Sequence, residues 1–137
     1  MNYWLVKSEP SVWSWDQQVA NGKKGEPWTG VRNHSAKLNM MKMKKGDRAF
    51  FYHSNEGKEI VGIVEIVREH YPDPTDATGK FVCVDIIAGK PLKKPVTLTA
   101  VKGEAALADM ELLRLSRLSV QSVTPAQWKH VCKMGGL

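Results

Sequence analysis

The sequence lacks the features of several protein classes. Cysteine occurs only at Cys83 and Cys132, with no CxxC pair, so we expect neither a disulfide framework nor a cysteine metal site. No apolar stretch approaches the roughly 20 residues that span a bilayer. No basic segment leads into an apolar one after Met1, as in a secretory signal. We therefore expect an intracellular, cytoplasmic protein without membrane contact, because unpaired cysteines suit a reducing compartment.

The motifs of common enzyme classes are also absent. The sequence contains no GxSxG, no HExxH and no glycine-rich phosphate loop. His53 and Ser54 are neighbours on a predicted strand and so point to opposite faces, which is unsuited to a base and its nucleophile. We predict no catalytic residue, no metal and no cofactor, and favour a binding role over an enzymatic one.

Acidic residues are fewer than basic ones. Fourteen Asp and Glu stand against 20 Lys and Arg, which gives a net charge of +6 and a pI near 9.4. A positive surplus bears on binding partners, and phosphate contacts supply most non-specific affinity for nucleic acid. Charge alone leaves two interpretations open, a nucleic-acid-binding protein and a basic protein without such a partner.

The element pattern predicts one α+β domain over residues 1–137. Capping boxes beginning at Ser14 and Thr124 predict helices that end near Gly22 and Met134, and Asn33 is a good N-cap for a helix over 34–43. The other predicted elements are strands over 3–7, 48–54, 59–69, 81–88 and 115–123, a helix over 99–108 capped by Thr99, loops over 23–32 and 71–79, and an irregular segment over 89–96, which contains Pro91 and Pro95. Closing these strands into a barrel would hide their edges.

Polar and aromatic residues gather in four segments at predicted strand ends or at the start of a helix, where binding sites usually lie. The segments are Lys7-Ser8-Glu9, Trp28 to Asn33, Phe51 to Ser54, and Arg117 to Val120.

These segments also carry a family resemblance. "YWLVKSEP", "WTGVRNHSAK", "FFYHS", "VGIVEIV", "YPD" and "RLSVQ" occur in the order and approximate spacing of the EVE domain, a PUA-like family that includes the thymocyte nuclear protein type. The resemblance covers nearly the whole chain. It implies a PUA-like mixed β-barrel of five to six strands surrounded by short helices. It also implies a pocket similar to that of YTH and SRA domains, which hold a flipped-out or single-stranded modified base.

The resemblance also implies a partner. EVE domains are thought to read modified bases, so we expect a nucleic acid carrying a modified base, with a modified cytosine in DNA favoured over RNA, and a monomeric protein. Eukaryotic members carry a longer insertion after the YPD motif, whereas only about Pro74 to Lys80 follows it here. This difference concerns the nucleic-acid footprint more than the pocket.

A base pocket needs a flat apolar wall and a few polar groups. Trp28, in a loop rich in proline and glycine, is the candidate for stacking, with a lid over the core as the alternative. Asn33 either caps a helix or presents its amide, and Tyr52 and His53 share one role because only one of their faces meets the opening. The predicted base-binding residues are Lys7, Ser8, Glu9, Trp28, Val31, Asn33, Tyr52, His53 and Ser54; the predicted phosphate-binding residues are Arg32, Lys37 and Arg117; and Trp4, Trp13, Trp15 and Trp128 are assigned to the core.

Two alternatives remain open. PUA-like relatives of the ASCH type hydrolyse modified nucleosides with a Lys, a Thr and a Glu, and Lys7 and Glu9 would face one side of a strand together. A desolvated lysine there could act as a base. The other alternative is a general RNA-binding module.

Overall fold

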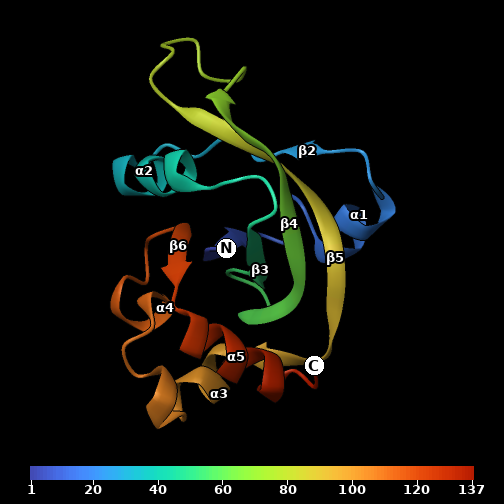
Figure 1. Ribbon diagram of the computed structural model, residues 1–137, viewed down its shortest axis with the longest axis vertical. Helices are drawn as coiled ribbons and strands as arrows, with labels where there is room; N and C mark the ends of the chain where they lie inside the picture. Colours follow the sequence, from blue (N-terminus) through green and yellow to red (C-terminus); the bar gives the residue numbers. More distant parts are fainter.

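A computed structural model describes all 137 residues and is built on one six-stranded mixed sheet (Figure 1). The strands are β1 (Tyr3–Ser8), β2 (Glu26–Pro27), β3 (Arg48–His53), β4 (Glu59–Pro72), β5 (Val82–Thr97) and β6 (Val120–Val123), in the spatial order β2-β5-β4-β3-β1-β6. Only β1 and β3 run parallel, with Ser8 opposite His53 at the ends of the two strands. The predicted segments that follow these two strands therefore emerge side by side.

The α+β class is confirmed, but the sheet is not closed into a barrel. β2 and β6 are the outer strands and do not pair with each other. They span two and four residues, and so short an outer strand presents few unpaired backbone groups. The prediction of closure was wrong: β2 and β6 stay apart, and most of the outer side of β5 remains an edge, which Pro91 and Pro95 protect from pairing.

Two hydrophobic cores lie on opposite sides of β3. Successive residues of a strand point to opposite faces, so Phe50 and Phe51 enter different cores. The site-side core contains Trp4, Val6, Trp15, Trp28, Val31, Met40, Phe51, Ile66 and Val84, among others. The helix-side core contains Leu5, Phe50, Tyr52, Ile60, Leu107, Met110, Trp128 and Val131, among others.

The helices divide between these cores. The site-side core includes residues of α1 (Trp15–Ala20) and α2 (His34–Lys42), and the helix-side core includes residues of α3 (Leu98–Lys102), the 3-10 turn η1 (Ala105–Leu107), α4 (Glu111–Arg114) and α5 (Pro125–Met134). Figure 1 shows α3, α4 and α5 gathered at the bottom of the view, whereas α2 lies in the upper half, below the connection between β4 and β5. Both predicted capping boxes are present, and Asn33 accepts a hydrogen bond from the Ala36 N–H as the N-cap of α2.

β5 corrects the prediction that residues 89–96 are irregular. The strand continues through Pro91 and Pro95 to Thr97. β2 pairs with β5 only at Asp85 and Ile86, so most of β5 has β4 as its single neighbour and its other side is an edge, where proline is tolerated. β4 likewise runs to Pro72, past the predicted loop start at Tyr71.

The C-terminal third differs most from prediction. The helix expected over 99–108 is α3, capped by Thr97 instead of Thr99, followed by η1. The strand expected over 115–123 is reduced to β6, and α4 precedes it. The buried Gln121 amide donates to the carbonyls of Leu115 and Leu118, which holds the segment before β6 in a turn. No helix of the chain is long and apolar enough to cross a membrane.

Candidate functional site

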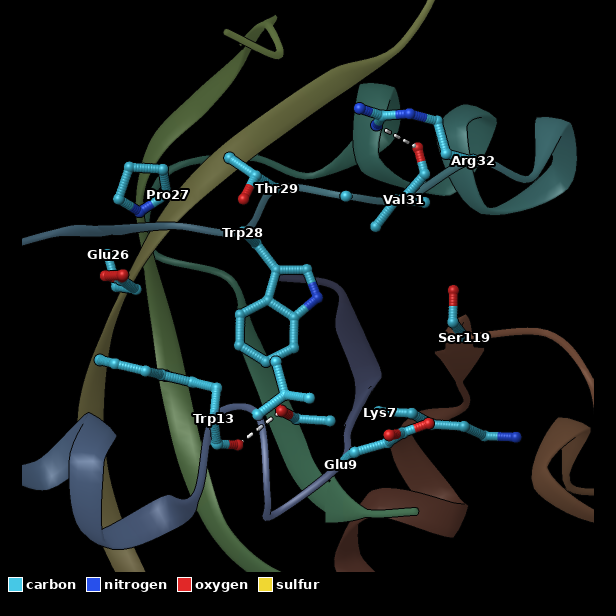
Figure 2. Close-up of a pocket in the computed structure, with 13 residues that line it drawn as sticks. Lys7, Glu9, Trp13, Glu26, Pro27, Trp28, Thr29, Val31, Arg32 and Ser119 are labelled. Atoms are coloured by element: carbon cyan, nitrogen blue, oxygen red, sulfur yellow. Dashed lines mark hydrogen bonds between the residues drawn. The ribbon is translucent and has the colours of Figure 1, made fainter. Parts of the chain in front are cut away.

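A cavity of about 550 Å³ opens where β1 ends (Figure 2). Its volume lies within the range of about 300–1,000 Å³ that is usual for small-molecule sites. Three segments line it: Lys7, Ser8, Glu9, Val12 and Trp13 from the end of β1 and the turn before α1; Glu26 to Arg32 from β2 and the loop that follows; and Ser119, just before β6. The wall is therefore mixed, with aromatic, charged and hydroxyl side chains.

Trp28 forms one wall of the cavity and is held in place by its backbone and by its neighbours in the core. Its backbone N–H donates to the Val84 carbonyl at 2.8 Å, which extends the pairing of β2 with β5. Its ring packs edge-on against Phe51, with centroids 5.7 Å apart, and the residue is only 8% exposed. The indole N–H forms no hydrogen bond within the chain, and it is not among the fully buried polar atoms that lack a partner. Figure 2 shows this nitrogen on the side of the ring that faces Ser119. Trp28 is thus both a core residue and a cavity wall.

Trp13 also lines the cavity, although the sequence assigned it to the core. Its indole N–H donates to the Gln18 side chain at 2.8 Å, and its carbonyl accepts from the Ser8 hydroxyl at 2.5 Å. These contacts tie the turn before α1 to the end of β1. Ser8 is therefore engaged in positioning Trp13 as well as in lining the cavity.

Asp73, the last residue of the YPD motif, holds the loop that carries Trp28. The buried carboxylate accepts from the Gly30 N–H at 2.9 Å and from the Arg32 guanidinium at 3.0 Å, and it also accepts from the N–H and hydroxyl of Thr75. Desolvation raises the pKa of Asp73, but the hydrogen bonds outweigh it and hold the pKa at about 2. The loop and the β4–β5 connection are thereby joined by an ionised carboxylate.

Lys7 lines the cavity, and Figure 2 shows its side chain running from the end of β1 away from the Trp28 ring. Its half-buried ammonium donates to the Ser116 carbonyl at 2.7 Å and lies 5.9 Å from the Tyr52 ring centroid. Burial lowers the pKa of Lys7 from its usual value. No carboxylate is close enough to form an ion pair with it, since the chain's ion pairs are Arg32–Asp73 and His130–Glu104. The positive charge of Lys7 therefore lies beside Ser116 and is not neutralised by a carboxylate.

Residues 2–134 match the family model of the EVE domain. The chain belongs to the EVE domain family.

This EVE domain is similar to several other proteins and solved structures. Thymocyte nuclear protein 1 of Mus musculus is 32% identical over 165 aligned residues, which cover 97% of this chain and 73% of the mouse protein. An NMR structure of a Rhodopseudomonas palustris protein is 76% identical, with a TM-score of 0.95 and coverage of 99% of this chain and 94% of that one. Human THYN1, solved in complex with DNA containing 5-methylcytosine, is 30% identical, with a TM-score of 0.91 and coverage of 100% and 99%.

A more distant structure supports the fold alone. The YTH domain of Zygosaccharomyces rouxii MRB1, solved in complex with N6-methyladenosine RNA, is 16% identical with a TM-score of 0.62, over 98% of this chain and 86% of that one. The relation to YTH domains that the resemblance implied is thus present in the fold.

The EVE domain brings half of the predicted site residues together. Lys7, Ser8, Glu9, Trp28, Val31 and Arg32 all line the cavity. Two features of the fold bring them together: β1 ends at the cavity, and the pairing of β2 with β5 holds the Trp28 loop beside that end. Arg32, predicted to contact phosphate, is engaged with Asp73 and Thr75.

The segment at the end of β3 does not reach the cavity. Tyr52 belongs to the helix-side core. His53 accepts the Trp15 N–H at 3.0 Å through Nε2, which fixes the start of α1, and burial lowers its pKa despite the opposing charges of Glu59 and Asp16. The Ser54 N–H donates to the Ser8 carbonyl. These three residues support the strand end and α1 and do not line the opening.

The other predicted residues also lie elsewhere. Asn33 and Arg117 line a second, separate cavity, and the Lys37 ammonium lies 5.9 Å from the Phe81 ring centroid. Sequence reasoning missed Trp13, whose position at a helix start resembles that of a core residue. It also omitted Ser119 from the site, although the RLSVQ motif contains it. No three His, Cys, Asp or Glu side chains are placed to hold a metal ion.

Proposed function

We propose that this EVE domain binds a modified nucleic-acid base, with 5-methylcytosine in DNA as the leading ligand. The observation that carries the proposal is Trp28: an anchored indole with an unpartnered N–H forms the wall of a cavity large enough for a base. The net charge of +6 and the human relative solved with 5-methylcytosine DNA support the same function.

The chemistry of the cavity suits cytosine. Cytosine presents an amino donor beside acceptor atoms. The carboxylates of Glu9 and Glu26 can accept from the amino group, and the Trp28 N–H and the Ser119 hydroxyl can donate to the acceptors. The apolar surfaces of Trp13 and Val12 offer contacts for a methyl group.

The experiment is a titration of the protein with matched oligonucleotides containing cytosine or 5-methylcytosine, as single-stranded DNA, double-stranded DNA and RNA. We expect tighter binding to the methylated DNA. Equal affinity for methylated and unmethylated strands would contradict base reading, and displacement of methylated DNA by unmodified RNA would instead indicate a general RNA-binding module.

Two serine variants test whether the modified base binds in the cavity. Ser119→Ala removes a hydroxyl from the cavity. The loss of one hydrogen bond, about 0.5–1.5 kcal/mol, should weaken binding of methylated DNA roughly two- to tenfold. Ser122→Ala is the matched control, because Ser122 is exposed on the neighbouring β6 and outside the cavity. An equal loss in both variants would place the base elsewhere.

A second candidate is hydrolysis of a modified nucleoside, favoured by one observation. Lys7, Thr29 and two glutamates line the same cavity, and burial lowers the pKa of Lys7, as a lysine base requires. Incubation with N-acylated and N-alkylated cytidines, followed by chromatography, tests it. Product formation that Lys7→Met abolishes would establish hydrolysis, and unchanged nucleosides would exclude these substrates.

A further inference from the structure

A second cavity of about 380 Å³ lies between the start of α2 and the segment joining α4 to β6. Asn33, Ser35, Arg114, Leu115, Arg117 and Leu118 line it, together with Ser116. No carboxylate belongs to this lining, which contains two guanidinium groups and two hydroxyls. Its composition therefore favours an anion.

The two arginines are free to bind one. Neither forms an ion pair, since the chain's ion pairs involve Arg32 and His130. Arg114 donates through Nε to the Asp109 carbonyl at 2.9 Å, which leaves its terminal N–H groups available. Both arginines are exposed, so a ligand can reach them without displacing the chain.

The second cavity adjoins the first through Lys7 and residues 116–119. Lys7 belongs to the lining of the first cavity, and its ammonium donates to the carbonyl of Ser116, which lines the second. The Lys7 N–H donates to the carbonyl of Ser119, which lines the first. The two cavities are therefore close enough for a strand whose base occupies the first to reach the second with its backbone.

We propose that Arg114 and Arg117 bind the phosphates that flank the base held in the first cavity. The proposal rests on the proposed function, and it differs from the sequence prediction in its residues. Arg32 is engaged by Asp73 and Thr75, and Lys37 lies against Phe81, so Arg117 is the residue of the predicted phosphate set that remains available. Arg114 joins it from α4.

The first test is the salt dependence of binding to an oligonucleotide with one central 5-methylcytosine. Each lost phosphate contact should reduce the slope of log affinity against log salt by about 1. Arg114→Gln/Arg117→Gln should therefore reduce the slope by about 2. When the salt concentration is lowered fourfold, the increase in affinity of this variant should be roughly 16-fold smaller than that of the unmodified protein. The preference for the methylated base should remain.

Two control variants sharpen this test. Arg114→Lys/Arg117→Lys keeps both charges and should retain the slope. Lys129→Gln/Lys133→Gln removes two exposed charges from α5 and should leave the slope nearly unchanged. An equal reduction with the α5 variant would show diffuse charge attraction and overturn the proposal.

The second test places the contact next to the base. Uncharged methylphosphonates replace the two phosphates flanking the 5-methylcytosine, and the arginine substitutions should then cause little further loss. Additive losses would overturn the assignment of the arginines to the flanking phosphates. Loss of this coupling while methylated DNA is still preferred rejects this proposal alone, whereas absence of any methyl preference rejects the proposed function.

Discussion

The two cores on either side of β3 use tryptophan in different ways. In the helix-side core Trp128 stacks between two rings, with centroids 3.9 Å from Phe50 and 4.4 Å from Tyr3. In the site-side core Trp28 meets Phe51 only edge-on at 5.7 Å, and it forms part of the cavity wall. Both residues are nearly buried. Burial alone therefore does not separate a tryptophan that stabilises the fold from one available to a ligand; stacked aromatic neighbours in one case and a place in a cavity wall in the other do.

The largest expected effect is on the closed stack. Trp128→Ala should lower the free energy of unfolding by about 3–5 kcal/mol, because a ring packed on both faces leaves a cavity that its neighbours cannot fill. Urea unfolding measures the loss. The affinity of the folded fraction for methylated DNA should not change, since Trp128 does not line the first cavity. A loss below about 1 kcal/mol would contradict the importance of the stack.

The site-side core should respond to an added atom. A Cβ at Gly62 would overlap the Trp15 ring, so Gly62→Ala should cost about 1–3 kcal/mol of stability by overpacking. Because Trp15 begins α1, directly after the turn that carries Trp13, affinity should also fall. Gly103→Ala is the control: its Cβ would meet nothing closer than 3.5 Å at a negative φ, and it should be tolerated. Equal effects would contradict the close approach.

Local chemistry made parts of the fold predictable. The capping boxes at Ser14 and Thr124 depend on residues within one turn, and both are confirmed. The extent of β5 was not predictable in this way, because a strand tolerates Pro91 and Pro95 only if its outer side is unpaired. That condition depends on the two-residue length of β2, which no local pattern reveals.

The site residues also divide into those that local sequence could place and those whose position depends on distant segments. Lys7, Ser8 and Glu9 could be placed at an opening because they follow a strand that is apolar on both faces. His53 could not be excluded, since only the position of α1 shows that its ring accepts the Trp15 N–H. The second cavity required the turn over residues 115–118, where sequence pattern predicted a strand.

Trp28 is the sharpest point of comparison with Trp128. Trp28→Ala should weaken binding of methylated DNA by about 1–3 kcal/mol, or roughly ten- to a hundredfold, through lost stacking. Its loss of unfolding free energy should be smaller than that of Trp128→Ala, because Trp28 stacks on no other aromatic ring and borders the cavity. Titration with methylated DNA measures the loss of affinity in each variant, and urea unfolding measures the loss of unfolding free energy. A stability loss equal to that of Trp128→Ala, with unchanged affinity in the folded fraction, would assign Trp28 to the core alone.

The smallest expected effect concerns the acid sensitivity of the site-side loop. Asp73 has a pKa of about 2 in the folded protein, against 3.8 for an unperturbed aspartate. A depressed folded-state pKa adds stability that is complete above the unfolded value and is lost as pH falls from about 4 through 2. The difference in unfolding free energy between the unmodified protein and Asp73→Asn should therefore be constant above pH 5 and shrink below pH 4, with a slope of at most one proton. Urea unfolding between pH 2 and 6 measures it. Asp109→Asn, at an exposed carboxylate with no side-chain hydrogen bond, is the control for the amide replacement itself and should leave the free energy of unfolding nearly unchanged at pH 6. If the difference between the unmodified protein and Asp73→Asn stayed constant down to pH 2, the ionised carboxylate would not be what joins the Trp28 loop to the β4–β5 connection.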